Sequence, residues 1–295
     1  MPSIPSKLAA RLQILVAALM WSSGGLFAKA PVFECWDKDT RGLMLAFWRA
    51  AFAAAVLTPM IRRPKWDIRL VPMTLCFSAM CVLYLSAMVL TTAANAIWLQ
   101  ATAPWWVFLL SIVAFREPVV RRDLVPLAFG FLGVGIILAF ELVVQPQNRL
   151  GVVCGVLSGI TYAAVIMFTR KLRDHDAAWL VGLNHIVATT LMLPLMLSLG
   201  IWPSPLQLAV LAAFGAFQMG IPYVLITRGL RTISSQEAVG ICLLEPVVNP
   251  LWVFLAWGEV PAWWTRVGAA LILAGLVLRY ALLERFGKGD SETGN

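Results

Sequence analysis

The sequence predicts an all-α membrane protein with ten transmembrane helices, arranged as two inverted five-helix repeats around a central cavity. Three observations carry this prediction. Hydrophobic residues make up 60% of the 295 residues and charged residues only 13%, about half the share of charge in a soluble domain. The mean hydropathy is +0.83. The apolar residues form ten separate runs, and the second half of the chain repeats features of the first.

Each apolar run is close to the length of about 20 residues that a helix needs to cross the hydrocarbon core. The runs lie at 12–29, 42–61, 70–91, 94–115, 122–140, 150–169, 177–199, 206–227, 234–257 and 262–283. They are continuous rather than alternating with a period of two, which excludes a transmembrane β-barrel. The first run is longer than the apolar core of a usual signal peptide, so we expect it to remain as a membrane helix.

The basic residues predict the orientation of the chain in the membrane. When Lys29 and Arg49 are set aside, 17 Lys and Arg residues fall on the side of the N-terminus and 4 on the other side. Basic residues collect on the cytoplasmic side, so both termini are predicted to be cytoplasmic, in a bacterial-type cytoplasmic (inner) membrane. The net charge of +8 then reflects topology and contact with anionic lipid, and it does not indicate a nucleic-acid partner.

The two halves of the chain can be aligned with each other. The aligned pairs are Pro104 with Pro246, Glu117 with Glu259 and Gly133 with Gly275 at an offset of 142 residues, and Trp21 with Tyr162 and Lys29 with Arg170 at 141. The alignment divides the chain into one repeat at 1–145 and a second at 146–295. Because each repeat holds an odd number of helices, the second enters the membrane inverted, and such repeats can open a central cavity to each side in turn.

The aligned segments PWWVFLLSIVAFRE and PVVNPLWVFLAWGE, with the ten-helix layout, resemble the drug/metabolite transporter superfamily. The closest likeness, over residues 12–284, is to its EamA-type permeases, which include bacterial amino-acid exporters of the inner membrane. The resemblance implies a secondary transporter that exports small metabolites by alternating access. Amino acids, and among them aromatic ones, are the favoured substrates. Export rather than import rests on the resemblance alone.

Other functions stay open beside this one. A transporter of another small metabolite or drug, such as a sugar, a nucleotide precursor or an organic cation, is the main alternative. The first run lacks the acidic residue that the four-helix multidrug members of the superfamily carry there, which argues against cation-for-proton exchange by that route. A channel is disfavoured, because duplicated proline-containing helices suit a moving cavity better than an open pore.

A membrane-embedded enzyme is the least favoured class. Two histidines and one acid near a helix centre are too few for a catalytic site, and the five cysteines lack the spacing of metal ligands. We therefore expect no enzymatic activity, no cofactor and no metal. The expected partners are a small-molecule substrate and membrane lipid, and a monomer is compatible with the sequence.

Glu245 is the only acid near the centre of a predicted helix. An ionised side chain there costs about 2.5–3.5 kcal/mol on insertion scales, so it should face protein or water. Pro246 follows it and Pro250 stands one turn later, and each removes a backbone donor and disturbs the preceding turn. We predict a bend in the cavity wall where Glu245 binds substrate. The alternative is a fixed buried acid that pairs with a neighbouring helix.

Two further polar residues have alternative readings. Arg49 lies about seven residues into the second run, where it could hold a substrate carboxylate, pair with Glu245, or extend its side chain to the outer interface. His185, in the matching run of the second repeat, is either a satisfied buried side chain or a proton-sensitive group.

The remaining predicted site residues are aromatic or amide side chains deep in the runs, with Trp21 and Tyr162 the stronger candidates because they are repeat mates. The predicted substrate-binding residues are Glu245, Arg49, Trp21, Tyr84, Trp98, Gln100, Tyr162, His185, Gln218 and Asn249, and the predicted hinges are Pro104, Pro222, Pro246 and Pro250. Aromatic walls with polar tips suit a small zwitterion that has an apolar side chain.

Overall fold

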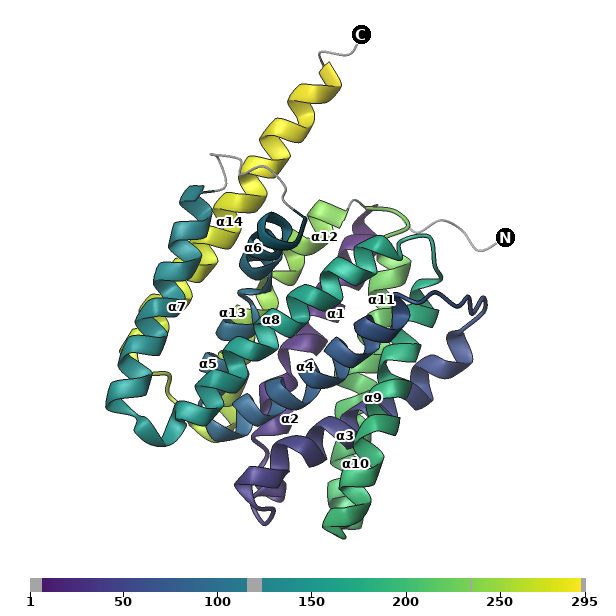
Figure 1. Ribbon diagram of the computed structural model, residues 1–295, viewed down its shortest axis with the longest axis vertical. Helices are drawn as coiled ribbons and strands as arrows, with labels where there is room; N and C mark the ends of the chain where they lie inside the picture. The colour runs from purple at the N-terminus through teal and green to yellow at the C-terminus, as the bar shows by residue number, and fades with distance from the viewer. Residues whose placement is uncertain (1–6, 116–123, 234, 293–295) are drawn as a thin grey trace.

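The computed structural model describes residues 7–115, 124–233 and 235–292, and every regular element in these ranges is a helix (Figure 1). The elements are α1 (Lys7–Ser22), α2 (Gly24–Ala28), η1 (Pro31–Phe33), α3 (Lys38–Leu57), η2 (Thr58–Met60), α4 (Leu70–Leu90), α5 (Ala93–Gln100), α6 (Ala103–Phe115), α7 (Leu124–Val144), η4 (Pro146–Asn148), α8 (Arg149–Lys171), α9 (Ala177–Leu199), α10 (Pro205–Ala213), the π-helix η5 (Phe214–Gly220), α11 (Ile221–Gly229), α12 (Ser235–Cys242), α13 (Leu244–Trp257) and α14 (Trp263–Glu292).

Eight helical segments among the described residues are long and apolar enough to cross a membrane. They are Lys7–Ala28, Lys38–Met60, Leu70–Leu90, Leu124–Val144, Pro146–Lys171, Ala177–Leu199, Pro205–Gly229 and Gly240–Trp257. The predicted run 94–115 is divided between α5 and α6, and the run 262–283 lies almost entirely within α14. The all-helical, multi-pass class is therefore confirmed, whereas the count of ten spans and the inversion of the second half stay predictions.

Several helix ends are fixed by short polar side chains or by glycine. Asp37, Thr92 and Asp176 each accept a hydrogen bond from a backbone N–H in the first turn of the helix that follows, which satisfies a donor that has no partner inside the helix. Gly200 and Gly258 end α9 and α13 with φ values of 63° and 68°, a left-handed conformation that favours glycine. The chain thus reverses direction at defined points.

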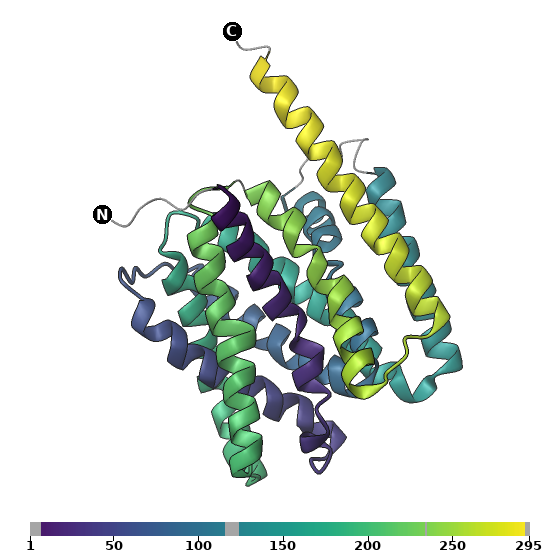
Figure 2. The same ribbon diagram turned by 180° about the vertical axis from the view of Figure 1, so that it is seen from behind.

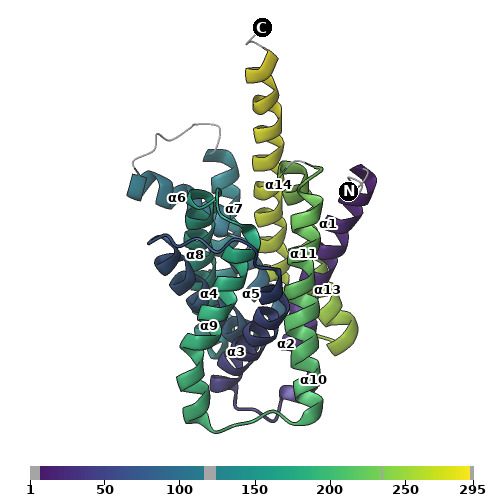
Figure 3. The same ribbon diagram turned by 90° about the vertical axis from the view of Figure 1, so that its right-hand side faces the viewer.

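The helices form one bundle, with α7 and α14 side by side as an antiparallel pair at its edge (Figures 1 and 2). Close packing also joins α4 to α8, α3 to α9 and α1 to α11. Helix α1 begins and α14 ends at the same end of the bundle, which we name the terminal face (Figure 3). The loops at 29–37 and 258–262 lie at the opposite end, which we name the distal face (Figure 2).

Glycines let the backbones of α7 and α14 approach each other. A Cβ atom on Gly133 would lie 2.5 Å from the carbonyl oxygen of Gly268, and one on Gly268 would lie 2.6 Å from the carbonyl oxygen of Gly133. No side chain fits at either position unless the helices separate. In lipid, burial of apolar surface gives no driving force for helices to associate. Small residues at a crossing instead allow the close packing that holds the helices together.

Substitution of Gly133 by valine should therefore destabilise the fold. We expect a loss of about 1–3 kcal/mol, as for overpacked cores, and a fall of several degrees in the midpoint of thermal unfolding in detergent. Gly135→Val is the matched control, because a Cβ atom there has no neighbour within 4 Å. Equal unfolding midpoints for the two variants would contradict the crossing.

Candidate functional site

Two helices are interrupted at matching places in the two halves of the chain. One helix ends at Gln100 and resumes after two residues, and the other ends at Cys242 and resumes after one residue. Each ends four residues before a proline, Pro104 or Pro246. Proline cannot donate the hydrogen bond that a carbonyl four residues earlier would accept, so the helix is released at that carbonyl. Two of the four predicted hinges therefore coincide with real interruptions.

A third irregularity precedes Pro222. The π-helix η5 at Phe214–Gly220 interrupts the regular turns between α10 and α11. In a regular helix the carbonyl of Gln218 would accept a hydrogen bond from the backbone N–H of residue 222. Proline has no N–H, and the loss of this bond favours the wider π turn around Gln218. Such π turns occur frequently at functional sites. At Pro250, by contrast, α13 continues without a break. The hinge predicted at Pro250 therefore stays a prediction.

The three irregular segments contribute to the wall of one cavity with a volume of about 140 Å³, which is room for several water molecules. The lining residues are Trp21, Arg49, Met80, Tyr84, Ile97, Gln100, Ala101, Tyr162, Gln218, Met219, Tyr223, Glu245 and Pro246. Eight of them were predicted as site residues from the sequence. The other five were not, since an apolar or aromatic residue inside an apolar run gives no signal of its own.

Arg49 projects from α3 into this cavity and is only 3% exposed. Its guanidinium carbon lies 5.9 Å from the ring centre of Tyr84 and 5.4 Å from that of Phe214, distances at which a cation is attracted to an aromatic face. The side chain does not extend to the surface, so the expectation that it reaches the outer interface is wrong. The two aromatic rings flank the guanidinium of Arg49 at the cavity wall.

Glu245 lines the same cavity from the first turn of α13. The positive end of the helix dipole favours a carboxylate at that position. The ion pairs of the described residues do not include one between Glu245 and Arg49. The cavity therefore carries one basic and one acidic group that do not neutralise each other by direct contact, and a molecule between them could bind both.

Aromatic side chains and the amides of Gln100 and Gln218 also line the cavity. Trp21 and Tyr223 meet edge to face with ring centres 5.3 Å apart. Tyr162, the repeat mate of Trp21, lines the cavity from α8. The Gln218 side chain donates through Nε2 to the Trp21 carbonyl at 3.1 Å, while its Oε1 is buried and has no hydrogen-bond partner. This oxygen can accept a hydrogen bond from a ligand.

Three predicted substrate-binding residues do not line the cavity. Trp98 is buried in the core, because Ile97 and Ala101 share the cavity face of the chain and Trp98 points about 100° away on the helix. His185 lies behind Tyr223, with Nδ1 placed 2.9 Å from the Val181 carbonyl oxygen. Asn249 is fully buried against Gly25, and neither of its amide atoms has a hydrogen-bond partner. Glu117 lies outside the described residues.

The sequence matches the EamA-like transporter family over residues 8–139 and again over 149–281. The chain belongs to the EamA-like transporter family. The transporter therefore moves small molecules across a membrane, and its membership argues against an enzyme.

Two comparisons agree with this membership. The transporter is 27% identical over 198 residues to an "uncharacterized transporter" of Archaeoglobus fulgidus, an alignment that covers 67% of this chain and 70% of that one. A solved structure described as "Crystal structure of protein" has the same fold, with a TM-score of 0.63 and 18% identity over 94% of this chain and 99% of the other.

Proposed function

We propose that the transporter exports amino acids with large apolar or aromatic side chains across the cytoplasmic membrane by alternating access. The observation that supports this most directly is the pair of opposite charges, Arg49 and Glu245, on one aromatic-walled cavity. An arginine can bind a carboxylate through two parallel hydrogen bonds, and a carboxylate can accept from an ammonium group. One group of each sign suits a zwitterion, and it suits a nucleotide or another multiply charged metabolite poorly.

The rest of the wall favours a large side chain on the substrate. Trp21, Tyr84, Tyr162 and Tyr223 present rings to the cavity, and aromatic pairs gain about 0.5–1.5 kcal/mol beyond area burial. Met80 and Met219 add flexible apolar surface, which adapts to side chains of different shape.

Alternating access is supported by matching features of the two halves. The family matches fall one in each half, and the helix interruptions at Pro104 and Pro246 align at the offset of 142 residues. At the same offset Gly133 aligns with Gly275, and Pro126 aligns with Gly268. Gly133 lies close to Gly268, and Gly275 lies close to Pro126, so the same contact occurs twice. We therefore propose repeats at 1–145 and 146–295 related by an axis in the membrane plane, which can exchange conformations to open either side.

The orientation follows from the charges in the loops. We propose that the terminal face, which carries the start of α1, is cytoplasmic, because the sequence assigns 17 Lys and Arg residues to the side of the N-terminus and 4 to the other side. A bacterial-type inner membrane and the outward direction of transport are extended from the resemblance to amino-acid exporters.

Competition in proteoliposomes tests the substrate class. Unlabelled phenylalanine, tryptophan, threonine and a hexose are added separately against labelled phenylalanine. We expect tryptophan to compete best and the hexose not to compete. If the hexose competes and the amino acids do not, the zwitterion argument is wrong, and the same assay is then extended to nucleotide precursors and organic cations.

The double variant Trp21→Ala/Tyr162→Ala should weaken tryptophan transport about fivefold or more relative to alanine transport, because the stacking surface is lost. Phe217→Ala is the matched control, since Phe217 lies in the same π-helix as Gln218 but does not line the cavity. Equal effects on tryptophan and alanine would mean that the two rings only support the fold.

A further inference from the structure

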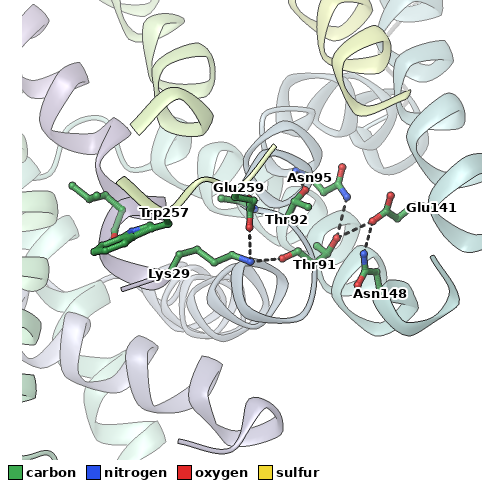
Figure 4. A network of polar contacts seen from close by, with 10 residues as sticks. Lys29, Thr91, Thr92, Asn95, Glu141, Asn148, Trp257 and Glu259 are labelled. Atoms are coloured by element: carbon green, nitrogen blue, oxygen red, sulfur yellow. Dashed lines mark hydrogen bonds and ion pairs between the residues drawn. The ribbon is translucent and has the colours of Figure 1, made fainter. Parts of the chain in front are cut away.

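A chain of polar contacts crosses the distal face of the bundle (Figure 4). Lys29, just after α2, places its Nζ 2.8 Å from Oε2 of Glu259 and donates to the Thr91 carbonyl oxygen at 2.6 Å. The other carboxylate oxygen of Glu259 accepts from the backbone N–H of Ala93 at 2.7 Å, at the start of α5. Lys29 and Glu259 therefore tie together three segments that are remote in the sequence.

One side of this chain is a fixed support. Glu141 is only 2% exposed, and its carboxylate accepts hydrogen bonds from Thr91 Oγ1 at 3.2 Å, Asn148 Nδ2 at 2.7 Å and Trp264 Nε1 at 2.7 Å. A buried carboxylate with three donors is expensive to separate from them. These bonds hold the Thr91 residue, whose carbonyl receives Lys29, against α7 and α14.

The ion pair itself is different, because it is partly exposed at the distal face. The side chains of Lys29 and Glu259 are 20% and 21% exposed. When the pair separates, both charged groups can therefore be hydrated, which lowers the free energy of separation below that of a buried pair. A contact that must break and re-form in each transport cycle needs this property.

Side chains pack closely on the backbone of Gly25, which lies along the chain between the cavity residue Trp21 and Lys29. A Cβ atom on Gly25 would lie 2.5 Å from Asn249 Oδ1, 2.7 Å from Val253 Cγ2 and 3.2 Å from the Ala93 side chain. Trp257 Nε1 also donates to the Leu26 carbonyl oxygen at 2.9 Å. Helix α2 is thus packed tightly against α13, and against the start of α5, over the turn that leads to Lys29.

We infer that Lys29 and Glu259 form an ionic latch that closes the distal side of the transporter over the packed layer at Gly25. The inference rests on the proposed function, since a latch is useful only where a cavity opens to two sides in turn. Lys29 belongs to the first half of the chain and Glu259 to the second. The pair can therefore restrain the movement of one half relative to the other. Breakage of the latch connects the cavity to the distal side.

The test measures access to the cavity and needs no substrate. The five native cysteines are replaced, and Ala101, a small residue of the cavity wall, is changed to cysteine as a reporter. A membrane-impermeant maleimide is applied to intact cells, where the distal face is outside under the proposed orientation, and to inverted membrane vesicles. If the orientation is opposite, the two preparations exchange roles and the comparison between variants stays valid.

Lys29→Met and Glu259→Gln should each speed labelling from the distal side about five- to tenfold, because loss of the latch shifts the population toward the distally open conformation. The double variant should be no faster than either single variant, since all three lack the same contact. Lys29→Arg should stay near the unmodified rate. Lys38→Met, which removes an exposed basic residue from the same face, is the matched control.

Unchanged labelling in both single variants, or equal acceleration by Lys38→Met, overturns the latch. An additive double variant overturns it as well, because it means two independent effects. Glu259→Gln keeps an oxygen that can accept from Ala93, so this variant carries the test if Lys29→Met fails to fold. Faster labelling without amino-acid transport would retain the latch and reject the proposed substrate, whereas amino-acid transport with unchanged labelling would do the reverse.

Discussion

Replacement of Arg49 by methionine should lower the initial rate of phenylalanine transport in proteoliposomes about 10- to 100-fold. A hydrogen bond to a charged group contributes about 1.5–3 kcal/mol, and every 1.4 kcal/mol or so corresponds to a factor of ten in affinity. Arg49→Lys should also lose about tenfold, because lysine keeps the charge but lacks the planar pair of donors that fits a carboxylate. The cavity position and the two flanking rings make the guanidinium orientation specific.

The Arg49 experiment needs a control for the unpaired charge of Glu245. Arg49→Met leaves Glu245 without a basic group on the cavity wall, and an uncompensated charge in a membrane can prevent folding. The double variant Arg49→Met/Glu245→Gln removes both charges and should recover the yield of folded protein without recovering transport. Normal transport by Arg49→Lys would mean that a positive charge alone suffices. Normal transport by Arg49→Met would mean that Arg49 serves only the fold.

Replacement of Glu245 by glutamine should reduce phenylalanine transport about tenfold or more while the yield of folded protein stays close to normal. Glutamine has nearly the same shape and still accepts a hydrogen bond, but it offers no negative charge to an ammonium group. The variant therefore separates the charge of Glu245 from its volume. Initial transport rates and the midpoint of thermal unfolding, measured on the same preparation, give the two readings.

Analogues that lack one charge sharpen this prediction. Phenylpropionate has no ammonium group and phenethylamine has no carboxylate. Phenylpropionate should compete relatively better in Glu245→Gln than in the unmodified transporter, and phenethylamine should compete relatively better in Arg49→Met. In each of these combinations the protein lacks the group that would bind the charge missing from the analogue. Comparison of both ligands in both proteins therefore gives the coupling energy between the protein group and the ligand group. If both analogues compete equally less well in both variants, Arg49 and Glu245 do not bind the carboxylate and the ammonium group separately as proposed.

The interruptions in the helices could be located from the sequence. Pro104 and Pro246 release carbonyls four residues earlier, and the helices end at those residues, Gln100 and Cys242. This effect acts within one turn of one helix, although α13 continues through Pro250 and α9 through Pro194. The same locality explains why apolar run lengths predicted the helical segments.

The faces of the helices could not be located in this way. In a helix surrounded by lipid and by other helices, nearly every position is apolar, and the periodic polar face that marks a soluble helix is absent. Ile97 and Trp98 are neighbours in the chain, yet Ile97 lines the cavity and Trp98 is in the core. Arg49 was equally consistent with the cavity and with the interface until its position among Tyr84 and Phe214 was known.

Residue types and local spacing are enough to predict the membrane class, the helical segments, the breaks at two prolines and the presence of one acid and one arginine deep in the runs. Each of these depends on residue type and on spacing of a few residues along one chain segment. The folded arrangement is needed to see that Arg49 and Glu245 line the same cavity and that Lys29 pairs with Glu259. The two pairs are separated by 196 and 230 residues along the chain, so only the packing of helices from both halves brings their charges together.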